Sequence, residues 1–419
     1  MDRLFQLYLQ HGSVSTDTRK IEKGDLFFAL KGANFNGNTF ALKALEAGAS
    51  AAIVDEDHEF GDNPAIIKVE SVLAALQELA TQYRKFLGVP VLALTGSNGK
   101  TTTKELIAAV LSKKFKLHFT QGNLNNEIGV PLTLLSAPRD TEMMVVEMGA
   151  NHQGEIKALC EIAQPNYGMI TNIGLAHLEG FGGPEGVKKG KSEMYRFLES
   201  SHGKIFLNTG DEVLRSLVDH EENIIAYNAD EFTLVSGEFL QLKDLLGNQY
   251  PTHLVGAYNK SNVVAAIAIG TYFGVSQDQI TSAIRDYMPT NNRSQKAEFK
   301  GALIIKDAYN ANPSSMKAAL DAFLTTDVED KLVILGDMLE LGEFSPEEHR
   351  KVLQKVCAYT LSDAIFIGPR FYEFKDEFPA RFFRNVQEAK LHLNWADYQN
   401  KTILLKGSRG IALEKLLED

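Results

Sequence analysis

The chain has 419 residues, of which 44% are hydrophobic and 23% are charged. This length exceeds what one ordinary hydrophobic core accommodates, so we expect two or three domains. The formal net charge of −11 argues against a nucleic-acid partner, because binding to a phosphate backbone favours a surplus of Lys and Arg. A nucleotide substrate is still allowed, because a local cluster of N–H donors, a lysine and a metal ion suffices to bind it.

The two cysteines, Cys160 and Cys357, are far apart in the chain and have no CxxC spacing. We therefore expect neither a disulfide framework nor a zinc site, and a reducing cytosol fits this usage. Residues 1–10 lack the apolar core of a signal peptide. No stretch approaches the roughly 18 apolar residues of a membrane helix. These features predict a cytoplasmic protein without membrane insertion.

The first section, residues 1–85, is predicted to be a small mixed unit. Residues 24–30 form a strand-like run, residues 40–48 a helical stretch, and residues 49–54 a second apolar run. No internal repeat or low-complexity segment interrupts the chain.

The second section, residues 86–290, alternates short apolar runs with longer helical segments. This alternation is typical of a parallel sheet. The predicted strands span residues 91–95, 143–147, 167–172 and 204–208.

The third section, residues 291–419, repeats this alternation, and we expect a Rossmann-like domain. The segment 288–292, Met-Pro-Thr-Asn-Asn, is a plausible hinge before it. The predicted strands span residues 303–307, 332–336, 364–368 and 403–406, and the predicted helices span 314–323 and 346–358. The fold class is therefore α/β in three domains, with a central parallel-sheet domain.

Residues 91–105 combine an apolar strand, a turn containing glycine and the start of a helix. Backbone N–H groups in such a turn and at the helix N-terminus form a nest for anions. Lys100 would reach the terminal phosphates of a nucleotide, and the Thr101 hydroxyl would bind Mg²⁺. Leu94 departs from the usual phosphate-binding loop, which has Gly at that position. The predicted nucleotide-binding residues are Gly96, Ser97, Asn98, Gly99, Lys100, Thr101 and Thr102.

Glu147 ends the predicted strand at 143–147. A carboxylate at a strand end beside a phosphate-binding loop is a natural oxygen ligand for Mg²⁺. Taken alone, such a glutamate is as often simply solvated. The amides of Asn123, Asn125 and Asn126 lie in a Gly-punctuated loop, where they could bind an oxygen-rich ligand or serve only turn chemistry.

Two further residues are ambiguous from the sequence alone. His177 follows a predicted strand, and a single histidine in such a place is more often structural than a ligand. Lys191 lies in a polar run that resembles the solvated face of a helix.

Polar residues also follow the strands of the third section, where ligands of parallel α/β sheets gather. They include Asp307, Asn310 and Asn312 after the first strand. Residues 336–342 follow the second strand, and Lys406, Ser408 and Arg409 follow the last.

Together these segments resemble the Mur ligase family over essentially the whole chain. The sequence Thr95-Gly-Ser-Asn-Gly-Lys-Thr-Thr102 is similar to the family's shortened phosphate-binding loop, in which Leu94 is expected. The resemblance implies ATP and Mg²⁺ as cofactors. It implies that Thr101, Glu147 and His177 bind Mg²⁺, that Lys191 carries a carbamate at the metal site, and that Lys100, Glu147, His177 and Lys191 serve catalysis.

The resemblance also implies further contacts to substrates. Asn259 and Asn262 would lie beside the adenine, and Arg293 and Asp307 would contact the phosphate and ribose of ATP. Asn36-Gly-Asn38 departs from the family's usual Asp-Gly-His. The implied substrate contacts are Thr18, Arg19 and Lys31 in a first domain that binds uridine diphosphate, together with Asn123, Asn125, Asn126, Asn310, Asn312, Lys406, Ser408 and Arg409.

Within the family, the segments Tyr309–Pro313, Gly336–Gly342 and Lys406–Arg409 resemble the members that add a dipeptide. This implies UDP-N-acetylmuramoyl-tripeptide and D-alanyl-D-alanine as small-molecule substrates of a monomer. One alternative is another amino-acid ligase of the Mur or folylpolyglutamate type. A second alternative, of a different class, is a phosphate-loop switch or motor ATPase, which would turn over ATP without a carboxylate substrate.

Overall fold

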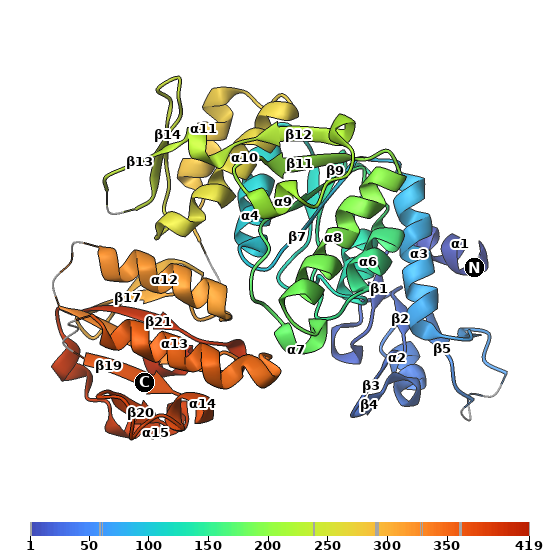
Figure 1. Cartoon of the computed structure of the whole chain (residues 1–419). Helices are drawn as coiled ribbons and strands as arrows, with labels where there is room; N and C mark the ends of the chain where they lie inside the picture. The colour runs from blue at the N-terminus through green and yellow to red at the C-terminus, as the bar shows by residue number, and fades with distance from the viewer. Residues whose placement is uncertain are drawn as a thin grey trace.

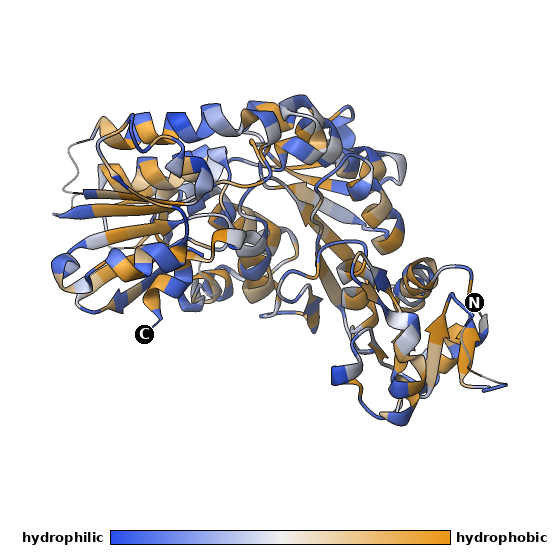
Figure 2. Cartoon of the chain, turned by 90° about the horizontal axis from the view of Figure 1, so that it is seen from below, coloured by the Kyte–Doolittle hydropathy of each residue, from blue (hydrophilic) through white to orange (hydrophobic). Residues whose placement is uncertain are grey.

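The computed structural model describes residues 2–57, 60, 62–237, 239–289, 293–326, 328, 330–359 and 363–418. The chain forms three successive α/β bodies, which Figure 1 shows in blue, in cyan to yellow, and in orange to red. Each is built around its own sheet. In Figure 2 the strands are predominantly hydrophobic, while the helices alternate between hydrophobic and hydrophilic residues. The α/β class with three domains is confirmed.

The first body is a parallel sheet with the strand order β1-β2-β5-β6. All three residues of β2 and all four of β5 are buried, as expected for the two apolar runs. The elements are α1 (Asp2–His11), β1 (Val14–Ser15), β2 (Leu26–Phe28), β3 (Lys31–Gly32), β4 (Phe35–Asn36), α2 (Ala41–Glu46), β5 (Ala51–Val54) and β6 (Ile66–Lys68).

Helix α3 (Val72–Leu87) connects the first body to the second. The Ser71 side chain accepts a hydrogen bond from the Ala74 N–H at its start, and Gly88 ends it with a φ of 65°. The helix packs against α5 and α6 of the second body. Arg84 donates from Nε to the Ala163 carbonyl at 3.0 Å. By its packing, α3 therefore belongs with the central sheet.

The central sheet is parallel, in the order β12-β11-β10-β7-β9-β8. Strands β7, β9 and β11 have the predicted bounds, whereas β10 ends at Ile170 instead of residue 172. The sequence analysis missed the two edge strands, β8 and β12. The strands are β7 (Val91–Thr95), β8 (Leu117–Phe119), β9 (Met143–Glu147), β10 (Tyr167–Ile170), β11 (Lys204–Asn208) and β12 (Ile224–Tyr227).

Helices surround this sheet, and a small antiparallel sheet that we did not predict projects from it (Figure 1). The helices are α4 (Lys100–Leu111), α5 (Gly129–Leu135), α6 (Glu155–Ala163), α7 (Leu178–Phe181), α8 (Pro184–Ser200), α9 (Glu212–Arg215), α10 (Lys260–Tyr272) and α11 (Gln277–Asp286). The added strands are β13 (Thr233–Val235), β14 (Gln241–Lys243) and β15 (Gln249–Pro251).

The third body has the strand order β16-β17-β21-β18-β19-β20, in which β16 alone is antiparallel to its neighbour. The predicted hinge at 288–292 falls largely on residues 290–292, which lie outside the described residues. The strands are β16 (Gln295–Phe299), β17 (Ala302–Lys306), β18 (Lys331–Gly336), β19 (Asp363–Ile367), β20 (Arg381–Phe383) and β21 (Thr402–Lys406). The helices are α12 (Pro313–Thr325), α13 (Ser345–Cys357), α14 (Pro369–Tyr372) and α15 (Val386–His392).

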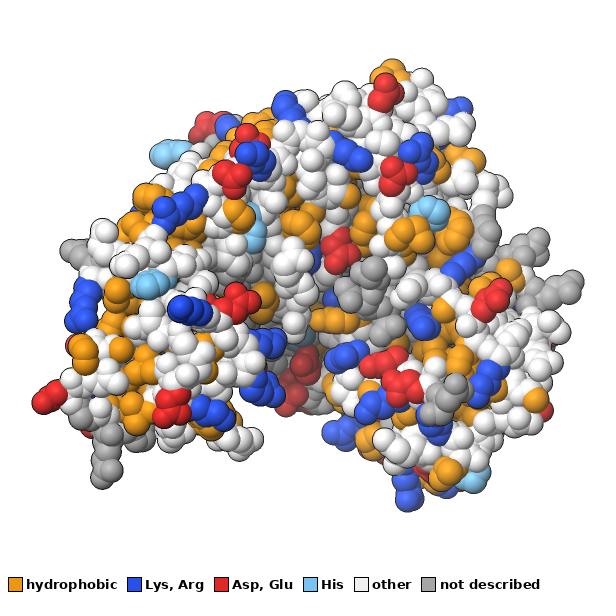
Figure 3. Space-filling model, turned by 180° about the vertical axis from the view of Figure 1, so that it is seen from behind, with side chains coloured by type: hydrophobic (Ala, Val, Ile, Leu, Met, Phe, Trp, Pro, Cys, Tyr) orange, Lys and Arg blue, Asp and Glu red, His pale blue; other side chains and the backbone are white. Residues whose placement is uncertain are grey.

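The third body touches the second at the carboxyl edge of the central sheet. The Asn312 amide donates to Asn98 Oδ1 at 2.8 Å, and the Leu175 N–H donates to Ser314 Oγ at 2.8 Å. Figure 3 shows the molecule hollowed between its two lower lobes. Among the residues that the structure describes, no helix combines the length and apolar character needed to cross a bilayer.

Candidate active site

A cavity of about 770 Å³ lies where the central sheet meets the third body. Both bodies contribute to its wall, because the carboxyl ends of parallel strands carry the loops that bind ligands. The predicted residues that line it are Ser97, Asn98, Gly99, Lys100, Thr101, Thr102, Asn123, Asn125, Asn126, Glu147, His177, Asn259, Asn262, Arg293, Asp307, Asn310, Asn312 and Lys406.

Two glycines shape the loop between β7 and α4. Gly96 has a φ of 142°, and a Cβ there would lie 2.0 Å from Thr171 Oγ. Gly99 has a φ of 78°, and a Cβ there would lie 2.6 Å from Asn262 Oδ1. Leu94, which departs from the usual motif, is fully buried in the strand β7. The position that is Gly in the usual motif therefore belongs to the strand here, and the loop begins after Thr95.

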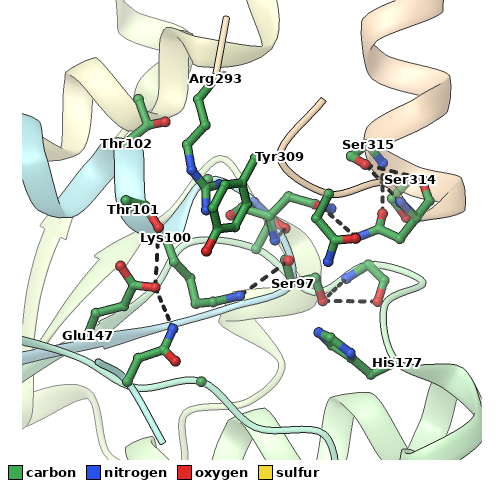
Figure 4. A pocket seen from close by; sticks show the side chains of 18 of the residues that line it. Ser97, Lys100, Thr101, Thr102, Glu147, His177, Arg293, Tyr309, Ser314 and Ser315 are labelled. Atoms are coloured by element: carbon green, nitrogen blue, oxygen red, sulfur yellow. Dashed lines mark hydrogen bonds between the residues drawn. The ribbon is translucent and has the colours of Figure 1, made fainter. Parts of the chain in front are cut away.

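Lys100 is the first residue of α4. Its Nζ donates to the Gly96 carbonyl at 2.7 Å, so the ammonium lies across the loop, as Figure 4 shows. Burial lowers the pKa of Lys100, and the charge of Glu147 opposes this shift. The ammonium is thus held by carbonyls of the loop itself, closely by Gly96 and more loosely by Ser97 at 3.5 Å.

Glu147 ends β9 and is 1% exposed. Its Oε1 accepts hydrogen bonds from Asn125 Nδ2 at 2.8 Å and from Thr101 Oγ at 3.3 Å (Figure 4). Its Oε2 is buried and has no hydrogen-bond partner within the described part of the chain. A buried carboxylate oxygen without a partner is costly, so this atom is available to a ligand.

Arg293 and Tyr309 form the opposite wall, and sequence analysis missed Tyr309. The Arg293 guanidinium lies 3.7 Å from the centroid of the Tyr309 ring. Its buried Nε has no hydrogen-bond partner among the described residues. A planar cation stacked on an aromatic ring suits recognition of phosphate.

Asp307, at the end of β17, pairs with Lys406, at the end of β21. Lys406 Nζ lies 2.6 Å from Asp307 Oδ2 and is 2% exposed at its side chain. The Ser294 N–H donates to Asp307 Oδ1 at 3.4 Å. These contacts orient the Asp307 carboxylate toward the cavity that both residues line.

Asn259 and Asn262 are buried and hydrogen-bonded to each other. Asn262 Nδ2 donates to Asn259 Oδ1 at 2.9 Å, and Thr103 Oγ donates to Asn262 Oδ1 at 3.0 Å. Asn259 Nδ2 donates to Ser294 Oγ at 3.0 Å. The pair therefore links α4 to the start of the third body. Ser294 carries no sequence motif that would have revealed it.

His177 lines the cavity on the side away from Glu147 in Figure 4. Its Nδ1 is hydrogen-bonded to the Glu340 carboxylate, which belongs to the third body. This contact lowers the pKa of Glu340. Both residues have a left-handed backbone, with φ values of 52° and 62°. His177 therefore connects the two bodies as well as facing the cavity.

Lys191 corrects the prediction of a solvated helix face made from composition. The side chain is fully buried in α8, and its Nζ donates to the Ala150 carbonyl at 3.1 Å. The ammonium lies 5.0 Å from the centroid of the Phe181 ring. Burial lowers the pKa of Lys191 well below its usual value, and the charge of Lys100 adds to this. Lys191 lies behind the cavity wall and does not line the cavity.

Several strand-end residues of the third body serve its own packing. Ser408 Oγ accepts from the Leu339 N–H at 2.9 Å and donates to the Ala311 carbonyl at 3.1 Å. Arg409 pairs with Glu414 at 2.8 Å. The Asp337 carboxylate is fully buried and accepts the N–H groups that begin α14. Position at a strand end therefore did not suffice to predict a cavity residue.

The predicted residues of the first body lie away from this cavity. Thr18 and Arg19 belong to a short 3-10 helix, and Arg19 pairs with Asp17 at 2.7 Å. Lys31 lies within 3.1 Å of Asp55 and 3.0 Å of Glu56. Gly96, Lys191, Ser408 and Arg409 are also absent from the residues that line the cavity. Residues that line the cavity and were not predicted include Asn172, Tyr258, Ser294, Tyr309, Ser314 and Ser315.

Models of protein families match three segments of the chain. The Mur ligase family catalytic domain matches residues 11–84, the Mur ligase middle domain matches residues 94–270, and the Mur ligase glutamate ligase domain matches residues 292–409. These segments correspond to the three sheets described above.

Curated relatives match over nearly the full length. The chain is 37% identical to the UDP-N-acetylmuramoyl-tripeptide--D-alanyl-D-alanine ligase of Bacillus subtilis (strain 168), over 98% of this chain and 93% of that protein. It is 33% identical to the ligase of the same name from Escherichia coli (strain K12), over 97% of this chain and 92% of that protein.

Solved structures agree with these matches. The crystal structure of MurF from Acinetobacter baumannii superposes with a TM-score of 0.86 at 30% identity, over 98% of this chain and 96% of that one. MurF ligase from Thermotoga maritima in complex with ADP superposes with a TM-score of 0.85 at 26% identity, over 98% and 97% of the two chains. On this sequence identity, coverage and fold, the chain belongs to the Mur ligase family.

Proposed function

We propose that this chain is an ATP-dependent ligase that joins D-alanyl-D-alanine to UDP-N-acetylmuramoyl-tripeptide in the synthesis of peptidoglycan precursors. Relatives that carry this reaction in their name align with nearly the full chain, and a similar structure binds ADP. The observation that carries the proposal is the composition of the cavity. It combines the glycine loop of Lys100 and the carboxylate of Glu147 with Arg293 and Asp307 from the third body.

The nucleotide would bind along the loop from Gly96 to Thr102. The backbone N–H groups and Lys100 would hold its phosphates. Arg293 would approach the phosphates from the third body, and Asp307, held by Lys406, would accept hydrogen bonds from the ribose. Asn259 and Asn262 would lie beside the adenine. Because the two side chains are hydrogen-bonded to each other, they would form part of the pocket wall beside the base.

The residues around Glu147 fit a magnesium ion. Its unpartnered Oε2 and the adjacent Thr101 hydroxyl are hard oxygen donors, and Mg²⁺ often uses one or two protein oxygens together with phosphates and water. The described residues contain no cluster of three or more His, Cys, Asp and Glu arranged to hold a metal ion. His177 would bind a second magnesium ion, or would hold the second and third bodies together through Glu340. Bound Mg²⁺ would neutralise phosphate charge during transfer.

Lys191 would carry a carbamate. The reaction joins the neutral amine to CO₂ and releases a proton, so a lowered pKa favours it. The resulting anion would replace a cation that repels Mg²⁺. Lys191→Ala should then lose most activity, and acetate or formate should restore part of it. Full activity of this variant, or density for an unmodified amine in a magnesium- and nucleotide-bound crystal, would refute the modification.

We propose a division of labour among three domains. Residues 1–85 would bind the uridine diphosphate group through Thr18, Arg19 and Lys31. Residues 86–290 would bind ATP, and residues 291–419 would bind ATP and the amine acceptor. The proposed contacts to the peptide substrates are Asn123, Asn125, Asn126, Asn310, Asn312, Lys406, Ser408 and Arg409. For Asn312, Ser408 and Arg409 the support is positional, because their side chains are already engaged.

The chemistry requires activation of the tripeptide carboxylate. One carboxylate oxygen attacks the γ-phosphorus of ATP, the bond to ADP breaks, and an acyl phosphate forms. The amine nitrogen of D-alanyl-D-alanine then attacks the acyl carbon, and the tetrahedral intermediate expels phosphate as the nitrogen loses a proton. Lys100 and the loop N–H groups stabilise the charge on the transferring group. The third body, held by Asn312 and Ser314, excludes water that would hydrolyse the acyl phosphate.

Phosphate release tests this function directly. We expect release with UDP-N-acetylmuramoyl-tripeptide and ATP to rise strongly when D-alanyl-D-alanine is added, with a new UDP-linked pentapeptide in the mass spectrum. Preference for single amino acids or for glutamate would instead indicate another Mur or folylpolyglutamate type. ATP turnover that is independent of any carboxylate substrate would indicate a switch ATPase.

We also propose that the ligase works as a monomer in the cytoplasm. The substrates are small and water-soluble, and neither cysteine pairs in a disulfide. A sedimentation experiment at micromolar concentration tests the oligomeric state.

A further inference from the structure

Lys104 lies one helical turn after Lys100 on α4, and its side chain is 1% exposed. Within the described residues its Nζ has no hydrogen bond. Its nearest charged neighbours are two carboxylate oxygens, Glu147 Oε2 at 3.9 Å and Glu105 Oε1 at 4.0 Å. The ammonium also lies 5.9 Å from the centroid of the Phe119 ring. It is therefore a buried cation that contacts its surroundings by charge.

A buried ammonium is costly unless charge or hydrogen bonds compensate it. If Lys104 served only packing, an apolar residue of similar volume would stabilise the fold at least as well. Here the cation faces Glu147 Oε2, the carboxylate oxygen that lacks a hydrogen-bond partner in the described structure. At 3.9 Å the two groups attract each other without sharing a hydrogen bond. Oε2 therefore keeps its lone pairs free.

The other charges nearby add to the positive charge around Glu147. Glu105 is partly committed elsewhere, because Tyr287 donates to its Oε2 at 2.6 Å. Lys100 and Arg293 add positive charge close to Lys104. The pocket around Glu147 is thus rich in cations when no phosphates are bound.

We propose that Lys104 is a positioning residue that balances the charge of Glu147 in the nucleotide-free protein and keeps divalent cations from binding there before the nucleotide does. The inference rests on the proposed role of Glu147 as a magnesium ligand. A divalent cation at Glu147 alone meets the repulsion of Lys104 in a poorly screened site. Nucleotide phosphates bring the negative charge that makes the same site attractive. The metal and the nucleotide then bind together.

The test measures binding in two separate experiments with the full chain. Lys104→Met keeps the length of the side chain and removes the charge. Without nucleotide, Mn²⁺ binding followed by electron paramagnetic resonance should tighten on the order of tenfold or more relative to the unchanged protein. Without metal, ADP binding followed by calorimetry should weaken severalfold, because one compensating cation is lost. Loosening of the fold would weaken both, so the opposite directions identify the electrostatic role.

Three further variants serve as controls. Lys113→Met removes one positive charge from the exposed turn that follows α4 and should leave both affinities unchanged. Lys104→Gln removes the charge with a polar side chain and should repeat both shifts. Lys104→Met combined with Glu147→Gln should lose the gain in Mn²⁺ affinity, because the ligand itself is weakened.

Unchanged Mn²⁺ affinity in both Lys104→Met and Lys104→Gln overturns the proposal, as does weaker binding of both ligands. A gain that survives Glu147→Gln means that Glu147 is not the ligand, which contradicts the proposed metal site instead. Failure of the unchanged protein to use D-alanyl-D-alanine would refute the proposed ligase reaction. That failure would leave the binding result intact.

Discussion

Three lysine side chains near the cavity are almost fully buried, and each has a different neighbour. Lys406 forms a close ion pair with Asp307. Lys104 faces two carboxylates without a hydrogen bond. Lys191 donates a hydrogen bond to a carbonyl and lies over an aromatic ring. These differences matter because a buried ammonium takes its properties from its immediate neighbours.

Lys100→Ala should lower kcat/KM by on the order of 10²–10³, because one preorganised charge at the transferring phosphoryl group is lost. The melting temperature should stay nearly unchanged, since Nζ contacts mainly the Gly96 carbonyl. A phosphate-release assay and a thermal melt measure the two quantities. Lys113→Ala, a change at an exposed position in the turn that follows α4, is the control. Near-normal activity of Lys100→Ala would show that this loop does not bind the phosphates.

Lys406→Met should destabilise the fold by about 1–3 kcal/mol, because Asp307, whose side chain is 16% exposed, would keep the Ser294 N–H but lose its ion-pair partner. The double variant Lys406→Met with Asp307→Asn should recover much of this loss, since no charge remains. Urea unfolding of both variants measures the difference. Equal stability of the single and double variants would contradict the buried ion pair seen at 2.6 Å.

At the scale of elements, Asp337 and Met338, which directly follow β18, turn into the third body and contact two of its helices, α14 and α13. The Asp337 carboxylate accepts the N–H groups of Arg370 and Phe371 at 2.8 and 2.9 Å, at the start of α14. The Met338 N–H donates to His349 Nε2 at 3.1 Å, so Nδ1 carries the proton and donates to the Ser345 carbonyl. Protonation of Nε2 would break this arrangement.

Burial shifts the pKa values of His349 and Asp337 in opposite directions, so the two groups change the folding stability with pH in opposite ways. It lowers the pKa of His349 to about 4 and raises the pKa of Asp337 to about 6. The His349 contribution is present above its unfolded pKa of 6.5 and is lost as the pH falls to about 4. This loss is on the order of 3 kcal/mol. The Asp337 contribution is present below its unfolded pKa of 3.8 and is lost as the pH rises through about 6. The two effects oppose each other between about pH 4 and 6.

Relative to the unchanged protein, His349→Gln should therefore gain stability as the pH falls from about 6 to about 4. Asp337→Asn should lose stability over the same window, because only the histidine effect remains. Denaturant unfolding at a series of pH values measures both slopes. Parallel pH profiles for the three proteins would show that neither group is shifted by burial.

At the scale of the whole molecule, α3 connects the first body to the central sheet. Helix α1 of the first body packs against α3, and α3 in turn packs against α5 and α6 of the second body. Val72, Leu76 and Leu79 on this helix are at most 1% exposed. Each such side chain contributes about 1.5–3 kcal/mol by burial. Loss of α3 would therefore uncover the central core.

A chain that begins at Ser71 should keep ADP binding and lose binding of the UDP-linked tripeptide. A chain that begins at residue 86 should lose both, because Arg84 and the apolar face of α3 are removed with the first body. Calorimetry with each ligand and circular dichroism of both truncated chains measure this. Full-length affinity of the shorter chains for the UDP-linked substrate would contradict a substrate role for the first body.

Sequence reasoning succeeded where the signal was local. Strands β7 and β9 each begin with four consecutive apolar residues. The first strand is followed by a glycine turn and the second ends in a carboxylate, and the predicted bounds of both strands are confirmed. The edge strands β8 and β20 escaped prediction because each has three residues whose extended shape depends on a neighbouring strand. The antiparallel β13–β15 sheet escaped for the same reason.

The sequence by itself determined the α/β class, the phosphate-binding loop and the strand that ends in Glu147, because each depends on residues adjacent in the chain. Only the tertiary structure decided which polar residues face the cavity. Lys191 and Lys104 lie on helices whose polar residues would ordinarily meet solvent, yet packing of neighbouring helices and strands buries both. Asp307 and Asp337 both follow strands, but one faces the cavity and the other is turned toward the N-terminus of α14. Burial and partner choice arise from contacts between segments far apart in the sequence, and no local pattern encodes them.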